Sequence, residues 1–297
     1  MSVSSTIYDP DLVTDLITKV VGRSTLAKLS QQIPVSFTGN KEMVFSMDKE
    51  MDIVAENGAK SHGGITVEPV TIIPIKFEYG ARVPDEYMYA SEEKKIDILA
   101  AFNDGFAKKA ARALDIAALH GINPRSGSAS TVVGTNYLAN LASTQITYDS
   151  SAPDENLEDA IEAIQALDGE VTGFALSTTF ASAMGKMKAS GTGEYLYPEF
   201  KFGANPGSFG GHPCDANTTV GYDSTHHAFV GDFANGFKWG YAKEIPLKVF
   251  DSGCPDNDSD AGDLAGHNQV YLRSELYIGW GILLPDSFAV IQDEVTE

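Results

Sequence analysis

The hydrophobic and polar positions from residue 91 to 121 follow a helical period. Apolar side chains recur at steps of three and four residues, as they do along one face of an α-helix. They are Ile96, Leu99, Phe102, Phe106, Ala110, Ala113, Leu114 and Ala117. Ser91 is a suitable N-cap and Gly121 a suitable C-terminal stop. The pattern predicts a helix roughly 40 Å long.

Residues 41–83 change to a period of two, which is typical of strands. The alternating apolar residues are Met43, Phe45, Met47, Ile73, Ile75, Phe77 and Tyr79. Between these runs, residues 55–66 are polar and rich in glycine, so we expect them to form the tip of a long hairpin. An isolated hairpin is marginally stable in water. This one is therefore expected to need a partner surface.

The rest of the chain predicts an arm and a mixed α+β body. Helical spacing of Leu12, Leu16 and Val20 is stopped by Pro34, and we read residues 1–33 as an arm. A second helix is expected from Pro153 to Gly169. A short helix capped by Ser177, a long loop at 191–213 and an acidic loop at 256–263 are also expected. Further strands are expected at 174–177, 226–233, 236–242, 245–253 and 269–291.

Composition narrows the class of protein. The 297 residues carry 41 acidic and 21 basic side chains, a formal net charge of −20, which disfavours a surface that binds nucleic acid or an anionic membrane. Two cysteines in a chain of this length do not form a disulfide framework, and a reducing compartment is favoured. No secretory signal and no apolar run of membrane-spanning length is visible.

A search for catalytic or metal-binding motifs finds only weak candidates. Asp256, Asp258 and Asp260 resemble the start of a calcium loop, but Ala261 stands where glycine is expected and His267 where glutamate is expected. A solvated acidic turn is the simpler interpretation. A zinc cluster of His212, Cys214, His226 and His227 matches no known zinc spacing, and neighbouring histidines on a strand point to opposite faces. No cofactor is expected.

Several stretches resemble the major capsid proteins of tailed bacteriophages, which have the Hong Kong 97-like fold. The order of elements matches over nearly the whole chain: arm, long hairpin, long helix, mixed central region, closing strand. The matching stretches are Glu56 with Lys60-Ser61, ARVPDEYMYAS (81–91), DIAALHG (115–121), Gly231-Asp232-Phe233, Asn268 to Glu275, Pro285 and Phe288. Their order and spacing together carry the resemblance, since none of them is specific alone.

The resemblance implies a division of the chain and a structural role. Residues 34–82 would be an extended loop that reaches across a neighbouring subunit. Residues 83–121, with the long spine helix, and 264–297 would form a peripheral domain, and 122–263 an axial domain. The protein would be a non-enzymatic shell subunit that assembles through pentamers and hexamers into an icosahedral virion head around double-stranded DNA, without sequence-specific DNA contacts.

The same resemblance implies partners and leaves alternatives open. Many members begin with a scaffolding domain, which this sequence lacks before the arm, so a separate scaffolding protein is expected, together with a portal. The resemblance leaves open whether decoration proteins also bind. Synthesis is expected in the bacterial host's cytoplasm, with no membrane association. Encapsulins, which form nanocompartments with the same fold, are the main alternative. A hydrolase with an unrecognised site is a remote one.

One branch of the family joins neighbouring subunits through an isopeptide bond between a lysine and an asparagine, assisted by a glutamate. Lys60, Asn268 and Glu275 are the candidate residues here. A spacing of seven places Asn268 and Glu275 on opposite faces of a regular strand, so a bulge would be needed to bring them together. Non-covalent polar contacts are the favoured interpretation.

Overall fold

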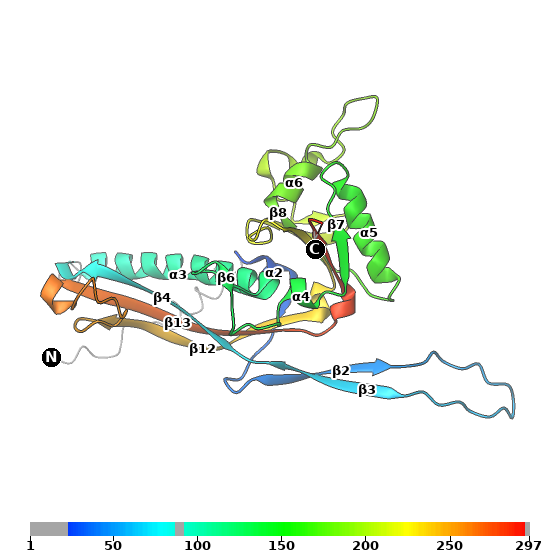
Figure 1. Cartoon of the computed structure of the whole chain (residues 1–297), viewed down its shortest axis with the longest axis horizontal. Helices are drawn as coiled ribbons and strands as arrows, with labels where there is room; N and C mark the ends of the chain where they lie inside the picture. Colours follow the sequence, from blue (N-terminus) through cyan, green and yellow to red (C-terminus); the bar gives the residue numbers. More distant parts are fainter. Residues whose placement is uncertain (1–22, 87–91, 295–297) are drawn as a thin grey trace.

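Two β-sheets form the body of the chain (Figure 1). One hydrophobic core is shared by the four-stranded sheet and one face of the six-stranded sheet, and a second lies on the other face of the six-stranded sheet. The structure, a computed structural model, describes residues 23–86 and 92–294, and only the backbone of 92–99 and 243–246. The four-stranded sheet has the order β1-β12-β13-β4, and its strands are Gln31–Gln32, Phe237–Phe250, Gln269–Ile282 and Ile75–Pro84. The predicted α+β class is confirmed.

The long helix α3 (Glu92–His120) lies along this sheet, as predicted (Figure 1). Small side chains on its inner face, chiefly alanines, are almost completely buried, which lets the helix axis approach the strands closely. They pack with Leu114 against Trp239 and Trp280 of β12 and β13. Gly121 ends the helix with a φ of 69°, a left-handed conformation that glycine adopts without strain.

The six-stranded sheet has the order β7-β14-β11-β8-β10-β9. Its strands are Thr144–Thr147, Phe288–Gln292, His226–Gly231, Gly173–Ser177, His212–Asn217 and Ser208–Phe209. Helices α5 (Pro153–Gln165) and α6 (Thr178–Met184) pack against it (Figure 1). The Ser177 hydroxyl accepts a hydrogen bond of 3.1 Å from the amide of Phe180, so the predicted cap of α6 is confirmed.

Short elements connect these layers. They are the helices α2 (Thr25–Leu29), α4 (Leu138–Leu141) and α7 (Phe233–Gly236), the strands β5 (Ile122–Asn123) and β6 (Ser128–Ala129), and the 3-10 turns Pro198–Gly203, Ala265–His267 and Pro285–Ser287. The turn Pro198–Gly203 lies within the predicted long loop at 191–213. The turn Pro285–Ser287 interrupts the predicted closing strand at 269–291. No described helix has the length and apolar character needed to cross a lipid bilayer.

The end of the predicted arm belongs to the body. The spacing of Leu12, Leu16 and Val20 lies outside the described residues. Leu26 of α2 is fully buried, and β1 pairs in parallel with Lys238 and Trp239 of β12. Residues 24–27 are therefore part of the core beneath α3, and residues 31–32 extend the four-stranded sheet.

Four predicted strands have different bounds in the structure. The runs at 236–242 and 245–253 form the single strand β12, which stays in the sheet through two irregularities, the second around Pro246. The run at 269–291 is two strands, because the turn at Pro285 sends β14 into the other sheet. Residues 75–84, expected in the hairpin, instead form β4 against β13.

Candidate assembly interface

A two-stranded ribbon projects from the body and has no sheet of its own to join (Figure 1). Strand β2 (Asn40–Met47) pairs antiparallel with β3 (Ile65–Ile72) in an unbroken register. The second hairpin strand is therefore 65–72 and not the expected run around Ile73–Tyr79. Pro74 separates the two runs, and Pro69 inside β3 masked its alternation in the sequence.

One face of this ribbon is apolar and exposed. Residues directly opposite one another in a ladder point to the same face, and so do every second residue along each strand. Three such register pairs, Met43–Pro69, Phe45–Val67 and Met47–Ile65, therefore share one face. Their large side chains are half to nearly three-quarters exposed, from 50% at Val67 to 71% at Met47. Nothing in the described chain covers them.

The root of the ribbon is fixed to the body. Ile72 is completely buried, and it lies over Gly279 and Gly281 of β13, where an added Cβ would meet its side chain at 3.0 and 2.8 Å. The Nζ of Lys238 lies 3.3 Å from a carboxylate oxygen of Glu42. The ribbon therefore emerges from a fixed base, and its apolar face begins beyond that base.

The ribbon ends in a segment without paired strands, residues 48–64. The amide of Gly64 donates a hydrogen bond of 2.5 Å to the carboxylate of Asp48, which closes the neck of this tip. Every side chain from 48 to 64, including Lys60, is exposed. The tip accordingly buries little within its own chain.

The three cross-link candidates are not gathered within one chain. Lys60 lies in the tip, Asn268 follows the 3-10 turn Ala265–His267 with a φ of 51°, and Glu275 lies within β13. The ladder between β13 and β4 is regular from Gln269 to Ile278, so it contains no bulge. Seven residues of strand place Asn268 about 23 Å from Glu275.

Glu275 is also engaged elsewhere. It is buried in β13, and its carboxylate lies 2.7 Å from the Nζ of Lys76 on β4. This hydrogen bond holds the pKa of Glu275 below its ordinary value, and it raises the pKa of Lys76. The carboxylate is thus ionised and already paired within its own subunit.

The acidic loop is stabilised by protein groups. The guanidinium of Arg82 donates hydrogen bonds of 2.6 and 2.7 Å to the two carboxylate oxygens of Asp256, and this contact lowers the pKa of Asp256. Asp258 accepts hydrogen bonds from the amides of Asp260 and Ala261. Two of the three calcium candidates therefore have protein partners, in keeping with a folded acidic turn.

The four zinc candidates from the sequence lie apart from one another. The ring of His212 packs edge-on against Phe174, while the buried Cys214 has its pKa raised to about 12 by burial. His226 and His227 point to opposite sides of β11, toward Asp223 and toward Asp293 respectively. In the described part of the chain, His226 is the one member of this set found in a potential metal-binding group.

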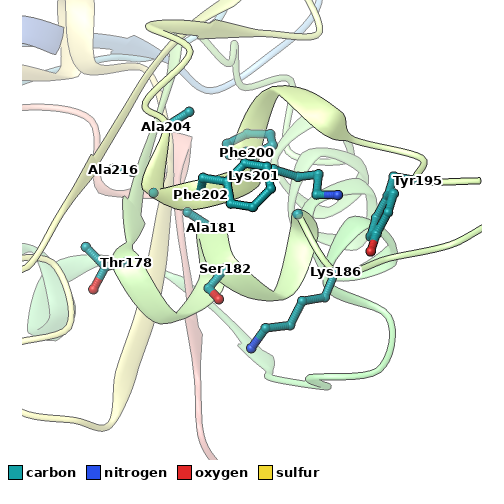
Figure 2. Close-up of a pocket in the computed structure, with 12 residues that line it drawn as sticks. Thr178, Ala181, Ser182, Lys186, Tyr195, Phe200, Lys201, Phe202, Ala204 and Ala216 are labelled. Atoms are coloured by element: carbon teal, nitrogen blue, oxygen red, sulfur yellow. The ribbon is translucent and has the colours of Figure 1, made fainter.

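A hollow of about 390 Å³ lies beside α6 (Figure 2). Figure 2 shows Lys201 reaching toward the ring of Tyr195, and its Nζ lies 3.1 Å from the ring centroid. The neighbouring Phe202 is fully exposed. Among the described residues, the hollow is lined by two lysines but by no carboxylate or histidine that could act as a general base. It therefore has none of the residue pairs used in acid–base catalysis.

The described body thus carries an apolar ribbon face that the rest of the described chain leaves uncovered, as expected of a subunit that contacts another molecule. The sequence matches the model of the phage capsid family over residues 6–293, and the chain belongs to this family. It is a major capsid protein, a structural component of a virion and not an enzyme. No protein of curated function matches it in sequence.

Solved structures agree with the family assignment. A chain from Mycobacterium phage Ogopogo is 30% identical, with a TM-score of 0.78 and 92% of each chain covered. A chain from Gordonia phage Cozz is 24% identical, with a TM-score of 0.75 over 92% of this chain and 87% of that one. The capsid of an empty GTA particle is 17% identical, with a TM-score of 0.62 over 92% and 90%. The last two show the shared fold.

Proposed function

We propose that copies of this chain assemble through pentamers and hexamers into a closed icosahedral head that encloses the double-stranded DNA of a tailed phage. The observation that carries the proposal is the exposed apolar face of the ribbon formed by Met43, Phe45, Met47, Ile65, Val67 and Pro69. Burial of each large side chain of this kind is worth roughly 1.5–3 kcal/mol. A neighbouring copy is the partner that a shell supplies at every such ribbon.

The charge of the chain supports an apolar contact between copies. Each copy carries a formal net charge of −20, so copies repel one another at long range. At 0.1 M salt this repulsion is largely screened beyond about 10 Å, whereas the apolar contact does not depend on screening. The same negative charge supports enclosure of DNA without tight or sequence-specific binding.

We propose domains that follow the two sheets. The extended loop comprises 34–74. A peripheral domain holds α3 and the four-stranded sheet, and an axial domain holds the six-stranded sheet. The expected ranges differ because β12, within 122–263, pairs with β13, whereas β14, within 264–297, joins the six-stranded sheet. Synthesis in the bacterial host's cytoplasm, a separate scaffolding protein, a portal and decoration proteins complete the proposal.

A pair of double variants tests the ribbon face. Phe45→Thr with Val67→Thr removes the central apolar pair. Both new residues are threonine, which is β-branched and has good strand propensity. The matched control, Val44→Thr with Glu68→Thr, alters the next register pair, which points to the opposite face. We expect both proteins to fold, and the first to form few shells by sedimentation and electron microscopy.

The control variant should assemble as the wild type does. Normal shells from the Phe45→Thr, Val67→Thr variant would contradict the proposed contact. Particles purified from the natural source distinguish the two kinds of shell, since DNA and a tail identify a phage head and protein cargo identifies an encapsulin-like compartment.

A further inference from the structure

The end of α3 meets the start of β11 at three potential ligand atoms. His120 is the last residue of α3, Asp223 lies in the turn before β11, and His226 is the first residue of β11. The Nδ1 atoms of His120 and His226 lie 3.2 and 2.5 Å from the same Oδ2 of Asp223. All three atoms lie within 4.8 Å of one another.

The hydrogen bonds of His120 fix which of its nitrogens faces this group. Its Nε2 lies 2.9 Å from the backbone carbonyl of Thr219, and a carbonyl can only accept, so Nε2 carries the proton. In the neutral ring, Nδ1 then presents a lone pair to Asp223. Among the described residues this Nδ1 makes no hydrogen bond of suitable geometry, although it lies 3.2 Å from Oδ2 of Asp223, and the His120 side chain is completely buried. A buried lone pair that faces a carboxylate is stabilised when a cation lies between the two groups.

Asp223 presents the same carboxylate oxygen, Oδ2, to both histidine rings. The ring of Phe229 packs against both histidine rings, with centroids 5.8 Å away in each case, and provides an apolar wall.

We propose that His120, Asp223 and His226 form a binding site for Zn²⁺. Two imidazole nitrogens and one carboxylate oxygen are a ligand set that zinc favours over magnesium or calcium. The hydrogen bond from His120 Nε2 to the Thr219 carbonyl is the outer contact by which metal-binding histidines are held in orientation. Asp223 and His226 are 19% and 15% exposed, so water can complete the coordination.

One of the two nitrogen–oxygen separations already suits zinc, and the other needs a small adjustment. Zinc–ligand bonds of about 2.0–2.2 Å in a tetrahedral arrangement place neighbouring ligand atoms roughly 3.3 Å apart. The contact between His120 and Asp223 already has this separation, at 3.2 Å. The contact between His226 and Asp223, at 2.5 Å, must open by less than about 1 Å. Bound zinc would fasten the end of α3 to the six-stranded sheet.

Zinc binding by the purified, unassembled full-length protein tests the proposal. After treatment with EDTA and its removal, Zn²⁺ is titrated against a chromophoric chelator, and thermal unfolding is followed with and without Zn²⁺. We expect one high-affinity ion per chain and a higher melting temperature with zinc. Asp223→Asn and His226→Gln should each weaken binding by more than about 100-fold and abolish the thermal shift. Both altered side chains are partly exposed, and circular dichroism checks that the variants are folded.

Two controls separate this site from incidental zinc binding. His227→Gln removes the adjacent histidine, which contacts Asp293 on the other side of β11, and Cys254→Ser removes the exposed thiol. Both variants should bind zinc as the wild type does. The proposal is overturned if the folded wild type binds no zinc when the ion is added in molar excess over the protein. It is also overturned if Asp223→Asn and His226→Gln bind zinc as the wild type does.

Discussion

The hydroxyl of Ser24 donates a hydrogen bond of 2.5 Å to the carboxylate of Asp115, which lies near the C-terminal end of α3. Asp115 is fully buried and also accepts hydrogen bonds from the amides of Thr25 and Leu26 and from the hydroxyl of Thr219. One carboxylate therefore accepts hydrogen bonds from the amides at the start of α2, and it joins α2 both to α3 and to the loop before β11.

Replacement of Asp115 by alanine should strongly destabilise the subunit. It leaves four buried donors without their acceptor, and we expect the free energy of unfolding to fall by ~3 kcal/mol or more. Urea denaturation of the unassembled protein measures this. The control is Asp104→Asn, which removes the carboxylate charge from another contact between α3 and the N-terminal segment, the largely exposed ion pair with Arg23. That change should cost less than about 1 kcal/mol; equal costs would contradict this account of Asp115.

The pair of Lys76 and Glu275 should make stability sensitive to acid. The folded-state pKa of Glu275 is lowered, so its contribution is present above the unfolded pKa of about 4.3 and is lost as the pH falls through the folded value. Glu275→Gln should therefore flatten the decline in the urea midpoint between about pH 5 and pH 3. Glu78→Gln, at an exposed position on β4, should leave that decline nearly unchanged. An identical acid profile for wild type and Glu275→Gln would refute the assignment.

Two glycine substitutions should have opposite effects. In Gly240→Ala the new Cβ would meet the carbonyl oxygen of Ile33 at 1.9 Å, so β1 must leave β12, and we expect an insoluble or severely destabilised protein. In Gly105→Ala, on the exposed side of α3, the new Cβ meets nothing within 4 Å. Alanine favours the helix there by roughly 0.5–1 kcal/mol. Thermal unfolding of the unassembled proteins should show a loss for the first and a gain for the second.

A shortened ribbon should separate folding from assembly. Residues 48–64 can be replaced by Asn-Gly, which closes a two-residue turn between the paired residues Met47 and Ile65. Because the tip buries little within its own chain, the melting temperature of the subunit should change little while shell formation is impaired. A large loss of cooperativity on melting would show instead that the tip stabilises the subunit.

Mature particles should contain no isopeptide cross-link. The carboxylate of Glu275, the candidate base, is already paired with Lys76 in its own subunit. Boiled particles on a denaturing gel should give a single band near the chain mass of 31.8 kDa. A ladder that disappears in Lys60→Ala would establish the bond.

The sequence predicted those elements whose residues share a local period. The 29-residue helix α3 was found because apolar residues recur at helical spacing along it. The strand before Ser177 was found because it is a short continuous apolar run, buried throughout, and Ser177 is itself a typical cap. The ribbon was predicted as a feature, but its second strand was misplaced, since Pro69 and the glycines before Ile65 resemble a turn.

Contacts between distant segments were not predictable in the same way. Asp223 and His226 are close in sequence, but their partner His120 is more than a hundred residues away, and no spacing rule connects them. Likewise, the closing stretch reads as one strand because both of its halves are apolar. The sequence does not specify that Pro285 sends β14 to a different sheet.

The direction in which the ribbon joins the body has a mechanical consequence. The chain leaves the ribbon at Ile72 and enters β4 at Ile75, which then runs away from the ribbon along β13 (Figure 1). Tension on the ribbon along this axis pulls β4 lengthwise past β13. Its ladder is thus loaded in shear, with all the register pairs from Ile75 to Pro84 bearing force together. A ribbon attached across the sheet would instead peel β4 away one pair at a time. The β4–β13 ladder therefore resists lengthwise tension on the ribbon better than it would resist tension across the sheet.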